Sequence, residues 1–265
     1  MNSNSENYQG GNRITTALLL AAGTGSRLFP LTKSSPKCLT LVNEKSILER
    51  LVNNLKKQGF TKLVIVTGHE KDCIMDFLGN KSDDITIEYV HSPLYKTTNN
   101  IYSLWMARDI ITEPFVLFES DVVLNTSLLN DMVYPDRMAV AKMQPWLNGT
   151  TVSLNKKNQI AQFQKGTTEA YSDKRYKTVN IYSFSLSSWQ AIVRKLNQYI
   201  ARGSVNCYYE SVFAEMIEEK TLLLESVSFD HKSWYEIDTI GDLAEAEKLF
   251  PIELLKQEKH VMAKA

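Results

Sequence analysis

The sequence predicts an α/β fold, in which a Rossmann-like, doubly wound mixed sheet carries helices on both faces. Three observations indicate this class. Short apolar runs at residues 17–22, 62–67 and 115–118 have the length and composition of buried parallel strands. Segments with the apolar spacing of helices separate these runs. The first run ends in a glycine-rich turn, and ligands of such sheets bind beyond the carboxyl ends of the strands.

The composition limits the classes of partner. The chain has 265 residues, of which 43% are hydrophobic, and its 30 basic side chains balance 30 acidic ones. This length allows one large domain with a substantial core. Without a basic run, neither nucleic acid nor a membrane surface is expected as a partner. Three scattered cysteines without metal-ligand spacing, and no apolar run long enough to span a membrane, favour a cytoplasmic protein.

The first half of the chain alternates between strand-like and helix-like segments. Residues 1–13 are polar, and we expect a disordered tail there. Ser46 and Glu49 have the spacing of a capping box, which predicts a helix that Gly59 closes. Strand, helix and strand then follow at residues 62–67, 70–78 and 85–90. This order predicts parallel pairing of the strands.

The second half is less regular. A polar loop at residues 91–100 precedes a helix near Ile101, and the strand at 115–118 runs into Asp121. We expect strands at residues 138–143, 151–154, 159–163, 178–184 and 222–227, and helices at 187–201, 208–219 and from 241 onward. Without repeats or a long linker, residues 14–250 are predicted to form a single domain, with a nucleotide half at 14–135, an acceptor half at 136–240 and a helix end and tail at 251–265.

The turn after the first strand reads Gly23-Thr24-Gly25-Ser26-Arg27. Backbone N–H groups at glycines can approach an anion closely, because no Cβ blocks the way. The dinucleotide fingerprint requires a third glycine where Leu28 stands, and the P-loop motif is also absent. With Arg27 and Lys37 as two fixed cations, the segment suits a nucleoside triphosphate whose pyrophosphate leaves. Taken alone, an ordinary tight turn is an alternative.

Two carboxylates follow strand-like segments. Asp121 ends one apolar run, and Asp238 ends the run Tyr235-Glu236-Ile237. Mg²⁺ is usually held by one or two carboxylates together with substrate phosphates, so this pair is a candidate metal site. The alternative for each is a helix N-cap, of the helix near Ser127 for Asp121 and of the last helix for Asp238.

Five segments carry a resemblance to a known family. Residues 20–37, with Leu-Ala-Ala-Gly-x-Gly-x-Arg-Leu followed by Pro-Leu-Thr and Pro-Lys, resemble the signature of nucleotidyltransferases that join a nucleoside triphosphate to a phosphorylated small molecule. Four further segments are similar to the bacterial choline-phosphate cytidylyltransferases and their phosphonate relatives: residues 98–104, 179–182, 208–210 and 234–238. The matches occur in the right order and span about residues 15–250.

The resemblance implies a nucleotidyltransferase fold of the GT-A-like type, CTP as the donor and Mg²⁺ as the cofactor, held by Asp121 and Asp238. Arg27 and Lys37 are the candidate catalytic residues. Asn100 and Ser103 offer the small donor and acceptor groups that cytosine needs, although capping the helix at Ile101 is an alternative for their neighbour Asn99. The predicted nucleotide-binding residues are Ala22, Gly23, Thr24, Gly25, Ser26, Asn100, Ser103 and Ser120.

The acceptor pocket is predicted from aromatic residues and a carboxylate. Aromatic faces beside Glu210 suit an ammonium head group, while Lys165 and Asn180 could reach the acceptor phosphate or phosphonate. The alternative for most of the aromatic residues is a place in the core. Phosphocholine, 2-aminoethylphosphonate and phosphoglutamine all fit this description. The predicted acceptor-binding residues are Trp146, Lys165, Asn180, Tyr182, Tyr209, Glu210 and Trp234.

Two other functions stay open at this point. One is sugar-1-phosphate nucleotidylyltransfer with UTP, dTTP or GTP, although Thr98-Asn99-Asn100 stands where sugar-nucleotide synthases typically carry Gly-Thr-Ala. The other is a nucleotide-sensing module without catalysis, which has little use for Arg27, Lys37 and both aspartates together. The superfamily often forms dimers, so a homodimer is an additional expectation.

Overall fold

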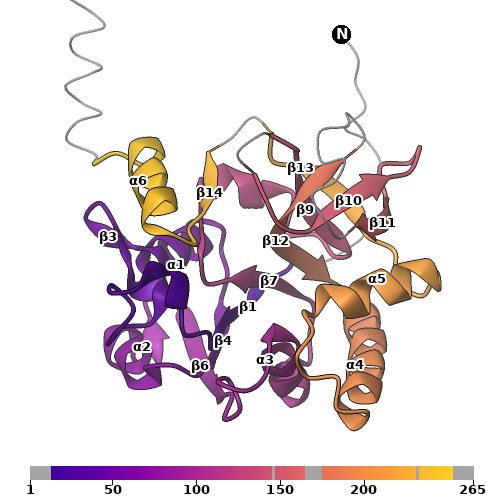
Figure 1. Cartoon of the computed structure of the whole chain (residues 1–265), viewed down its shortest axis with the longest axis horizontal. Coiled ribbons are helices and arrows are strands. Elements are labelled where there is room, and N and C mark those ends of the chain that lie inside the picture. Colours follow the sequence, from indigo (N-terminus) through magenta and orange to yellow (C-terminus); the bar gives the residue numbers. More distant parts are fainter. Residues whose placement is uncertain (1–12, 145–146, 165–174, 231–232, 253–265) are drawn as a thin grey trace, which may run out of the picture.

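The computed structural model describes residues 13–144, 147–164, 175–230 and 233–252. Its central sheet has ten strands. Their bounds are β1 (Thr16–Ala21), β4 (Lys62–Thr67), β5 (Lys81–Ser82), β6 (Ile85–His91), β7 (Phe115–Glu119), β9 (Arg137–Lys142), β10 (Thr151–Leu154), β11 (Ile160–Gln164), β12 (Tyr176–Phe184) and β13 (Glu225–Ser228). The order across the sheet is β11-β10-β12-β7-β1-β4-β6-β5, and β9 pairs with both β12 and β13 (Figure 1).

The middle of the sheet is parallel, which confirms the predicted fold class. β1 lies between β4 and β7 and runs parallel to both, and β6 runs parallel to β4. β12 then joins β7 in the antiparallel direction, so the sheet is mixed. The register pairs Leu20 with Glu119 and Ala21 with Thr67. The carboxyl ends of these parallel strands therefore meet at one edge, where ligands of such sheets bind.

The side chains of β1 alternate between two cores. Ala17, Leu19 and Ala21 pack on one face, and Leu18 and Leu20 pack on the other. All five are buried, because a parallel strand at the centre of a doubly wound sheet has helices on both sides. This explains why the sequence of β1 is continuously apolar instead of alternating.

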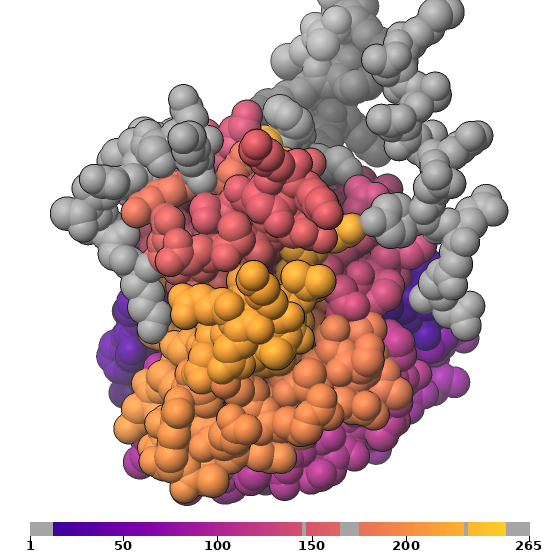
Figure 2. Space-filling view, turned by 90° about the vertical axis from the view of Figure 1, so that its right-hand side faces the viewer, coloured from indigo at the N-terminus to yellow at the C-terminus, as the bar shows by residue number. Residues whose placement is uncertain are grey.

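Within the described residues, five α-helices cover the sheet and a sixth packs beside it. α1 (Ile47–Lys57) and α2 (Lys71–Leu78) lie on one face, and α3 (Asn100–Met106), α4 (Leu186–Ala201) and α5 (Glu210–Glu218) lie on the other (Figure 1). The surfaces of α4 and α5 form the lower part of the view in Figure 2, below the β10–β11 strands. The predicted cap of α1 is confirmed, since Glu49 N donates to Ser46 Oγ at 3.1 Å. The sixth helix is α6 (Ile240–Leu249).

Two segments differ from the sequence expectation. The strand expected at residues 222–227 begins only at Glu225, because Leu222 and Leu224 are loop residues whose side chains fill the core beside α5. The antiparallel pairing of β8 (Val122–Leu124) with β14 (Trp234–Glu236) was also not predicted from the sequence. The remaining short elements are β2 (Leu41–Val42), β3 (Lys45–Ser46), η1 (Ser26–Leu28), η2 (Lys37–Leu39), η3 (Ala107–Asp109) and η4 (Thr126–Asn130).

A small third core lies beneath the loops that follow β1 and β14. Leu28 from η1, Val123 from β8 and Ile237 after β14 are buried together with Ala246 of α6. This cluster fixes the first loop against the C-terminal part of the fold. Within the described residues, no helix is long and apolar enough to cross a membrane.

Candidate active site

The glycine turn packs directly against the segment that carries Lys37. Gly25 has a φ of 62°, and a Cβ there would lie 3.0 Å from Thr32 Cγ2 and 3.2 Å from Lys37 Cβ. Thr32 Oγ1 donates to Gly25 O at 2.9 Å. Glycine at this position therefore permits both the left-handed backbone and the close approach of Lys37. The turn and the lysine act as one structural unit, although Lys37 lies ten positions after Arg27 in the sequence.

Lys37 lies between the two predicted metal ligands. Its Nζ is 2.8 Å from Asp121 Oδ2 and 2.7 Å from Asp238 Oδ1. Burial disfavours the charged ammonium, but Asp121 and Asp238 outweigh this effect and raise the pKa of Lys37 above its usual value. Arg27 Nη2 also lies 2.7 Å from Asp238 Oδ1. Two cations and two carboxylates thus share one polar centre at the carboxyl edge of the sheet.

The short β8–β14 pair brings the two carboxylates together. Asp121 immediately precedes β8, and Asp238 follows β14 by two residues. Ile237 N donates to Asp121 O at 2.9 Å, which extends the pairing to the aspartates. The N-cap alternatives are excluded, because Asn125 caps η4 and Thr239 caps α6 in a capping box with Asp242. Neither carboxylate has a capping role that accounts for its position.

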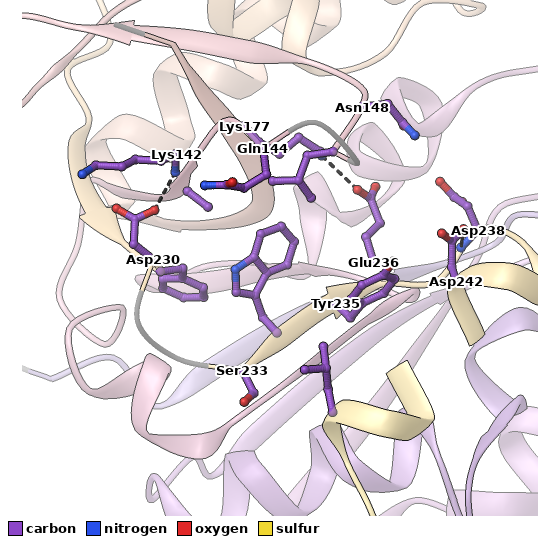
Figure 3. Close-up of a pocket in the computed structure, with 15 residues that line it drawn as sticks. Lys142, Gln144, Asn148, Lys177, Asp230, Ser233, Tyr235, Glu236, Asp238 and Asp242 are labelled. Carbon is purple, nitrogen blue, oxygen red and sulfur yellow. Dashed lines mark hydrogen bonds and ion pairs between the residues drawn. The ribbon is translucent and has the colours of Figure 1, made fainter. Parts of the chain in front are cut away.

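Two cavities meet at Asp238, which lines both. The glycine-loop cavity, of about 260 Å³, lies over the turn after β1 and the start of α3. The β14 cavity, of about 620 Å³, lies over β9, β12 and β14 (Figure 3). The described residues that line the β14 cavity include Lys142, Gln144, Asn148, Lys177, Asp230, Trp234, Tyr235, Glu236 and Asp242.

The glycine-loop cavity gathers most of the predicted nucleotide-binding residues. Thr24 is the exception, since it is exposed and does not line the cavity. Tyr95, Glu119 and Tyr208, which the sequence analysis did not single out, also contribute to the wall. The predicted residues that line the cavity are Ala22, Gly23, Gly25, Ser26, Arg27, Lys37, Asn100, Ser103, Ser120 and Asp121.

Asn100 is tied to the protein at both ends of its side-chain amide. Nδ2 donates to Glu119 Oε1 at 3.0 Å, and Oδ1 accepts from Tyr209 N at 3.0 Å. Its neighbour Asn99 caps α3 by accepting from Asn100 N. Asn100 therefore links the helix, the end of β7 and the loop that carries Tyr208. Ser103 Oγ makes a hydrogen bond to Ser92 Oγ at 3.3 Å in the cavity wall.

The predicted acceptor-binding residues do not form one group. Trp234 lines the β14 cavity, but Tyr182, Tyr209 and Glu210 line neither cavity. Tyr182 and Tyr209 are fully buried and contact each other edge to face, with ring centroids 5.8 Å apart. They follow the core alternative, because β12 turns Tyr182 toward α5. Trp146 and Lys165 lie outside the described residues.

Asn180 does not line the β14 cavity, but it holds Glu236, which does. Its φ of 60° lies in a stretch of β12 where the register with β9 shifts, and its Nδ2 donates to Glu236 Oε1 at 3.1 Å. Lys177 Nζ lies 2.9 Å from Glu236 Oε2. The sequence analysis missed Lys177 and did not select Glu236. The available signal was a lysine at the start of an apolar strand, and Glu236 stands within a segment that carried the resemblance.

Comparisons with known proteins show the family of this chain. The nucleotidyl transferase family model matches residues 16–250. The chain belongs to this family. A choline-phosphate cytidylyltransferase of Streptococcus pneumoniae is 26% identical over 88% of the chain and 97% of its own length. A CTP:phosphoglutamine cytidylyltransferase of Campylobacter jejuni is 26% identical, with 86% and 97% covered.

One relative is much longer than this nucleotidyl transferase. A CMP-5'-(3-aminopropyl)phosphonate synthase of Streptomyces rubellomurinus is 28% identical over 88% of the chain, and the chain spans 38% of that protein's length. Among solved structures, a CTP:phosphocholine cytidylyltransferase of Streptococcus pneumoniae aligns with a TM-score of 0.78 at 22% identity, over 90% of this chain and 100% of the other. At that identity the structural likeness shows the shared fold.

Nucleotidyl transferases generally use a divalent metal ion, and the residues present fit one. Asp121 Oδ1 is buried and has no hydrogen-bond partner, while Oδ2 and Asp238 Oδ1 both contact Lys37. Within the described ranges, no group of three or more His, Cys, Asp or Glu side chains forms a complete metal site. Two carboxylates with further oxygens from substrate phosphates are the ligand set that Mg²⁺ commonly uses.

Further carboxyl groups lie behind the two aspartates. Burial raises the pKa of Glu119 to about 8, with repulsion from Asp121 and Glu210 acting in the same direction. Burial likewise raises the pKa of Glu210 to about 7. Because both pKa values are raised toward or above neutral pH, these groups add less negative charge to the site than their number suggests.

Proposed function

We propose that this nucleotidyl transferase moves CMP from CTP to a small phosphorylated or phosphonate amine, of the phosphocholine or 2-aminoethylphosphonate type, and releases pyrophosphate in a Mg²⁺-dependent reaction. The observation that carries the proposal is the centre formed by Arg27, Lys37, Asp121 and Asp238 at the junction of two cavities. A donor in the glycine-loop cavity and an acceptor in the β14 cavity would meet at Asp238. The cytidylyltransferases among the relatives support cytosine as the base.

The turn after β1 would hold the triphosphate. Backbone N–H groups at Gly23 and Gly25 can approach phosphate oxygens, while Arg27 grips two oxygens and Lys37 adds a point charge. Asp121 and Asp238 would hold Mg²⁺, which screens the phosphate charges and orients them. The cations of the protein then stabilise the negative charge that develops on the departing pyrophosphate.

The acceptor supplies its own nucleophile. A phosphate monoester has a second pKa of about 6, so an oxygen of the acceptor is already anionic at neutral pH. This oxygen attacks the α-phosphorus of CTP, a P–O bond forms, and the bond to the bridging oxygen of pyrophosphate breaks. No general base is required. Catalysis rests on holding two anions in contact within a site whose fixed cations reduce their repulsion.

Recognition of the base is assigned to the wall formed by α3 and the end of β1. Ser103 and the backbone at Ala22 and Gly23 line the cavity and offer hydrogen-bonding groups of the size that cytosine requires. Asn100 serves chiefly to position this wall, since both ends of its amide have protein partners. Its remaining N–H and lone pair can still face the ligand.

The acceptor is assigned to the β14 cavity. Trp234 offers an aromatic face and Glu236 a carboxylate, and together they suit an ammonium group. Glu236 replaces Glu210 in this role, because Glu210 does not line the cavity.

Pyrophosphate release tests the proposed reaction. CTP, UTP, dTTP and GTP are each combined with phosphocholine, 2-aminoethylphosphonate, phosphoglutamine and glucose 1-phosphate, with Mg²⁺ or with EDTA. We expect turnover only with CTP, an amine-bearing acceptor and Mg²⁺. Preferential use of UTP or dTTP with the sugar phosphate would establish the sugar alternative instead. Full activity in EDTA would contradict the metal assignment, and light scattering separately checks the expected homodimer.

A further inference from the structure

A further cavity, the η3–α4 cavity, lies at the opposite end of the parallel strands from the active site. Its volume is about 370 Å³, and residues of η3 and α4 line it together with Ile111 and Thr112. Thr112 comes shortly before β7 begins, whereas Asp121 follows the carboxyl end of β7. A strand of five residues is about 16 Å long, so this cavity is separate from the site of the proposed reaction.

The walls of the η3–α4 cavity are apolar and are held together by hydrogen bonds. The apolar lining comes from Ile111, Leu186, Trp189 and Val193. Trp189 Nε1 donates to Ile111 O at 3.2 Å, which ties α4 to the segment before β7. Trp105 Nε1 of α3 donates to Asn197 Oδ1 of α4 at 2.8 Å, and the two helices lie side by side (Figure 1). The cavity is therefore formed before any ligand binds.

Two arginines give the cavity its charge. Arg108 comes from η3 and Arg194 from α4, and no carboxylate of the described residues lines the cavity. The guanidinium carbon of Arg108 lies 3.7 Å from the ring centroid of Trp105, and its Nη1 donates to Trp105 O at 3.2 Å. These contacts hold the planar group in one orientation. A guanidinium held in this way loses little conformational freedom when it binds an oxyanion.

The carboxylate that pairs with Arg108 can be replaced by a ligand. Arg108 Nη2 lies 3.0 Å from Asp109 Oδ2, and the side chain of Asp109 is 81% exposed. Exposed ion pairs of this kind contribute little to stability, so exchange of the carboxylate for another anion costs little. A guanidinium has five N–H donors, and the contacts to Trp105 O and Asp109 use two of them. Thr112 and Gln190 add exposed, uncharged polar groups to the lining.

The size and the lining of the cavity indicate the class of ligand. Pockets for small molecules have volumes of about 300 to 1,000 Å³, a mainly apolar lining and a few polar groups that fix the orientation of the ligand. A peptide helix is about 10 Å or more across, so a cavity of about 370 Å³ suits a small molecule better. Two arginines without a lining carboxylate favour a negative charge on that molecule.

We propose that the η3–α4 cavity binds a small amphipathic anion, whose apolar body packs on Trp189 and Val193 and whose anionic head is held by Arg108 and Arg194. This is a second ligand site of the protein. It does not depend on the proposed transfer of CMP, because none of its residues lines either cavity that meets at Asp238.

NMR titrations of the full chain test the site. Three probes share a naphthalene body: naphthalene-2-sulfonate is an anion, 2-naphthalenemethanol is neutral and 2-naphthylmethylammonium is a cation. Sodium sulfate supplies an anion without an apolar body. The indole N–H signals of Trp105 and Trp189 report on the η3–α4 cavity, and that of Trp234 reports on the β14 cavity.

Naphthalene-2-sulfonate should shift the signals of Trp105 and Trp189. We expect it to bind about tenfold or more tightly than each of the other three probes, since only this probe uses both the apolar walls and the arginines. A shift confined to Trp234, or equal affinity for naphthalene-2-sulfonate and 2-naphthalenemethanol, would overturn the proposal. Affinity that falls as the protein concentration rises would show that a second copy covers the cavity, and would overturn it too.

Two variants separate the charge of the cavity from its apolar walls. Arg108→Met and Arg194→Met should each weaken naphthalene-2-sulfonate by about fivefold and leave 2-naphthalenemethanol unchanged, because each removes one partner of the anionic head. Arg202→Met is the matched control, since it removes the same charge at the end of α4, outside the cavity. Unchanged sulfonate affinity in all three variants would show simple adsorption to apolar surface and would contradict the proposal.

Competition with CTP distinguishes this site from the active site. Saturating CTP in EDTA should leave the affinity for naphthalene-2-sulfonate unchanged, and displacement of the probe would overturn the proposal. If CTP fails to stabilise the protein thermally, the proposed function fails while this inference stands. Arg194 is exposed, so if Arg108→Met does not fold, Arg194→Met and the probe series on the wild type still decide the question.

Discussion

The two cavities that meet at Asp238 are built in different ways. The glycine-loop cavity is formed by loops at the carboxyl ends of parallel strands, and a single stretch from residue 22 to residue 37 supplies much of its charged and glycine-rich wall. The β14 cavity draws on β9, β12 and β14, which lie far apart in the sequence. In both, however, a half-buried or buried lysine contacts a carboxylate: Lys37 with Asp121 and Asp238, and Lys177 with Glu236.

This comparison assigns the two lysines different tasks. Lys37 lies beside the expected path of the leaving pyrophosphate, so its loss should affect the chemical step. Lys177 lies in the wall of the β14 cavity, the proposed acceptor site, so its loss should affect acceptor binding. The same local chemistry, a lysine paired with a carboxylate, would then serve catalysis in one cavity and selection in the other. The following predictions test that division.

The largest effect is expected at the shared centre. Asp121→Ala removes a proposed metal ligand and should lower kcat by more than about a hundredfold, because charge neutralisation at the phosphates is lost. Steady-state pyrophosphate release in Mg²⁺ measures this. The exposed Asp131→Ala is the control and should retain activity, and circular dichroism checks that both variants fold. Near-normal turnover of Asp121→Ala would exclude its metal role.

Substitution of the two lysines should change different kinetic parameters. Lys37→Met is expected to lower kcat by about a hundredfold, since it loses a cation that stabilises the leaving group. Lys177→Met should instead raise the KM for the acceptor by about tenfold or more, with the KM for CTP little changed. Initial rates with each substrate varied in turn give both values. An equal fall in kcat for both variants would remove the proposed division between the cavities.

Asn100 offers a test on the nucleotide side alone. Asn100→Ala loses hydrogen bonds to Glu119 and Tyr209, which hold the wall of the glycine-loop cavity. We expect the KM for CTP to rise by about tenfold, as the loss of one or two part-buried hydrogen bonds implies. The KM for the acceptor should stay the same. The companion variant Tyr208→Ala, at an exposed residue of the same wall, should change the KM for CTP in the same direction.

The smallest effect is expected in the way the melting temperature of the protein depends on pH. The pKa of Glu210 is about 7 in the folded protein against a reference value of 4.5, so its protonated form stabilises the fold. This contribution is fully present below pH 4.5 and is lost as the pH rises through 7. Glu210→Gln should therefore reduce the fall in Tm over this range by a few degrees. The exposed Glu218→Gln is the control, and an unchanged pH profile in Glu210→Gln would contradict the burial argument.

Much of the fold could be predicted from local sequence because local physics determines it. The apolar run of β1 requires burial on both faces, and Ser46 begins α1 because its hydroxyl caps Glu49 N. The antiparallel β8–β14 pair had no comparable signal, since each strand has only three residues and its partner lies more than a hundred positions away. Pairing at such separation depends on the rest of the fold.

Two of the predicted aromatic residues, Tyr182 and Tyr209, lie in the core for a related reason. A tyrosine in the sequence is compatible with the wall of a pocket and with the core. The side chains of Tyr182 and Tyr209 point into the core, where they contact each other. Trp234, by contrast, lines the β14 cavity together with Tyr235 and Glu236 of the same short strand. Residue type alone cannot distinguish these positions, because an aromatic ring is equally favourable in a core and against a ligand.

The sequence by itself determined the class of sheet, the glycine turn with Arg27 and Lys37, and the two aspartates at the ends of strand-like segments. These depend on short-range rules of strand burial, backbone freedom and charge. Only the tertiary structure decided that Lys37 lies between the two aspartates, that Asn100 links α3 to β7 and Tyr209, and that Lys177 pairs with Glu236 in the wall of the β14 cavity. The reason is physical: the charge that a buried side chain carries depends on partners from distant segments, and only the folded chain brings those partners within hydrogen-bonding distance.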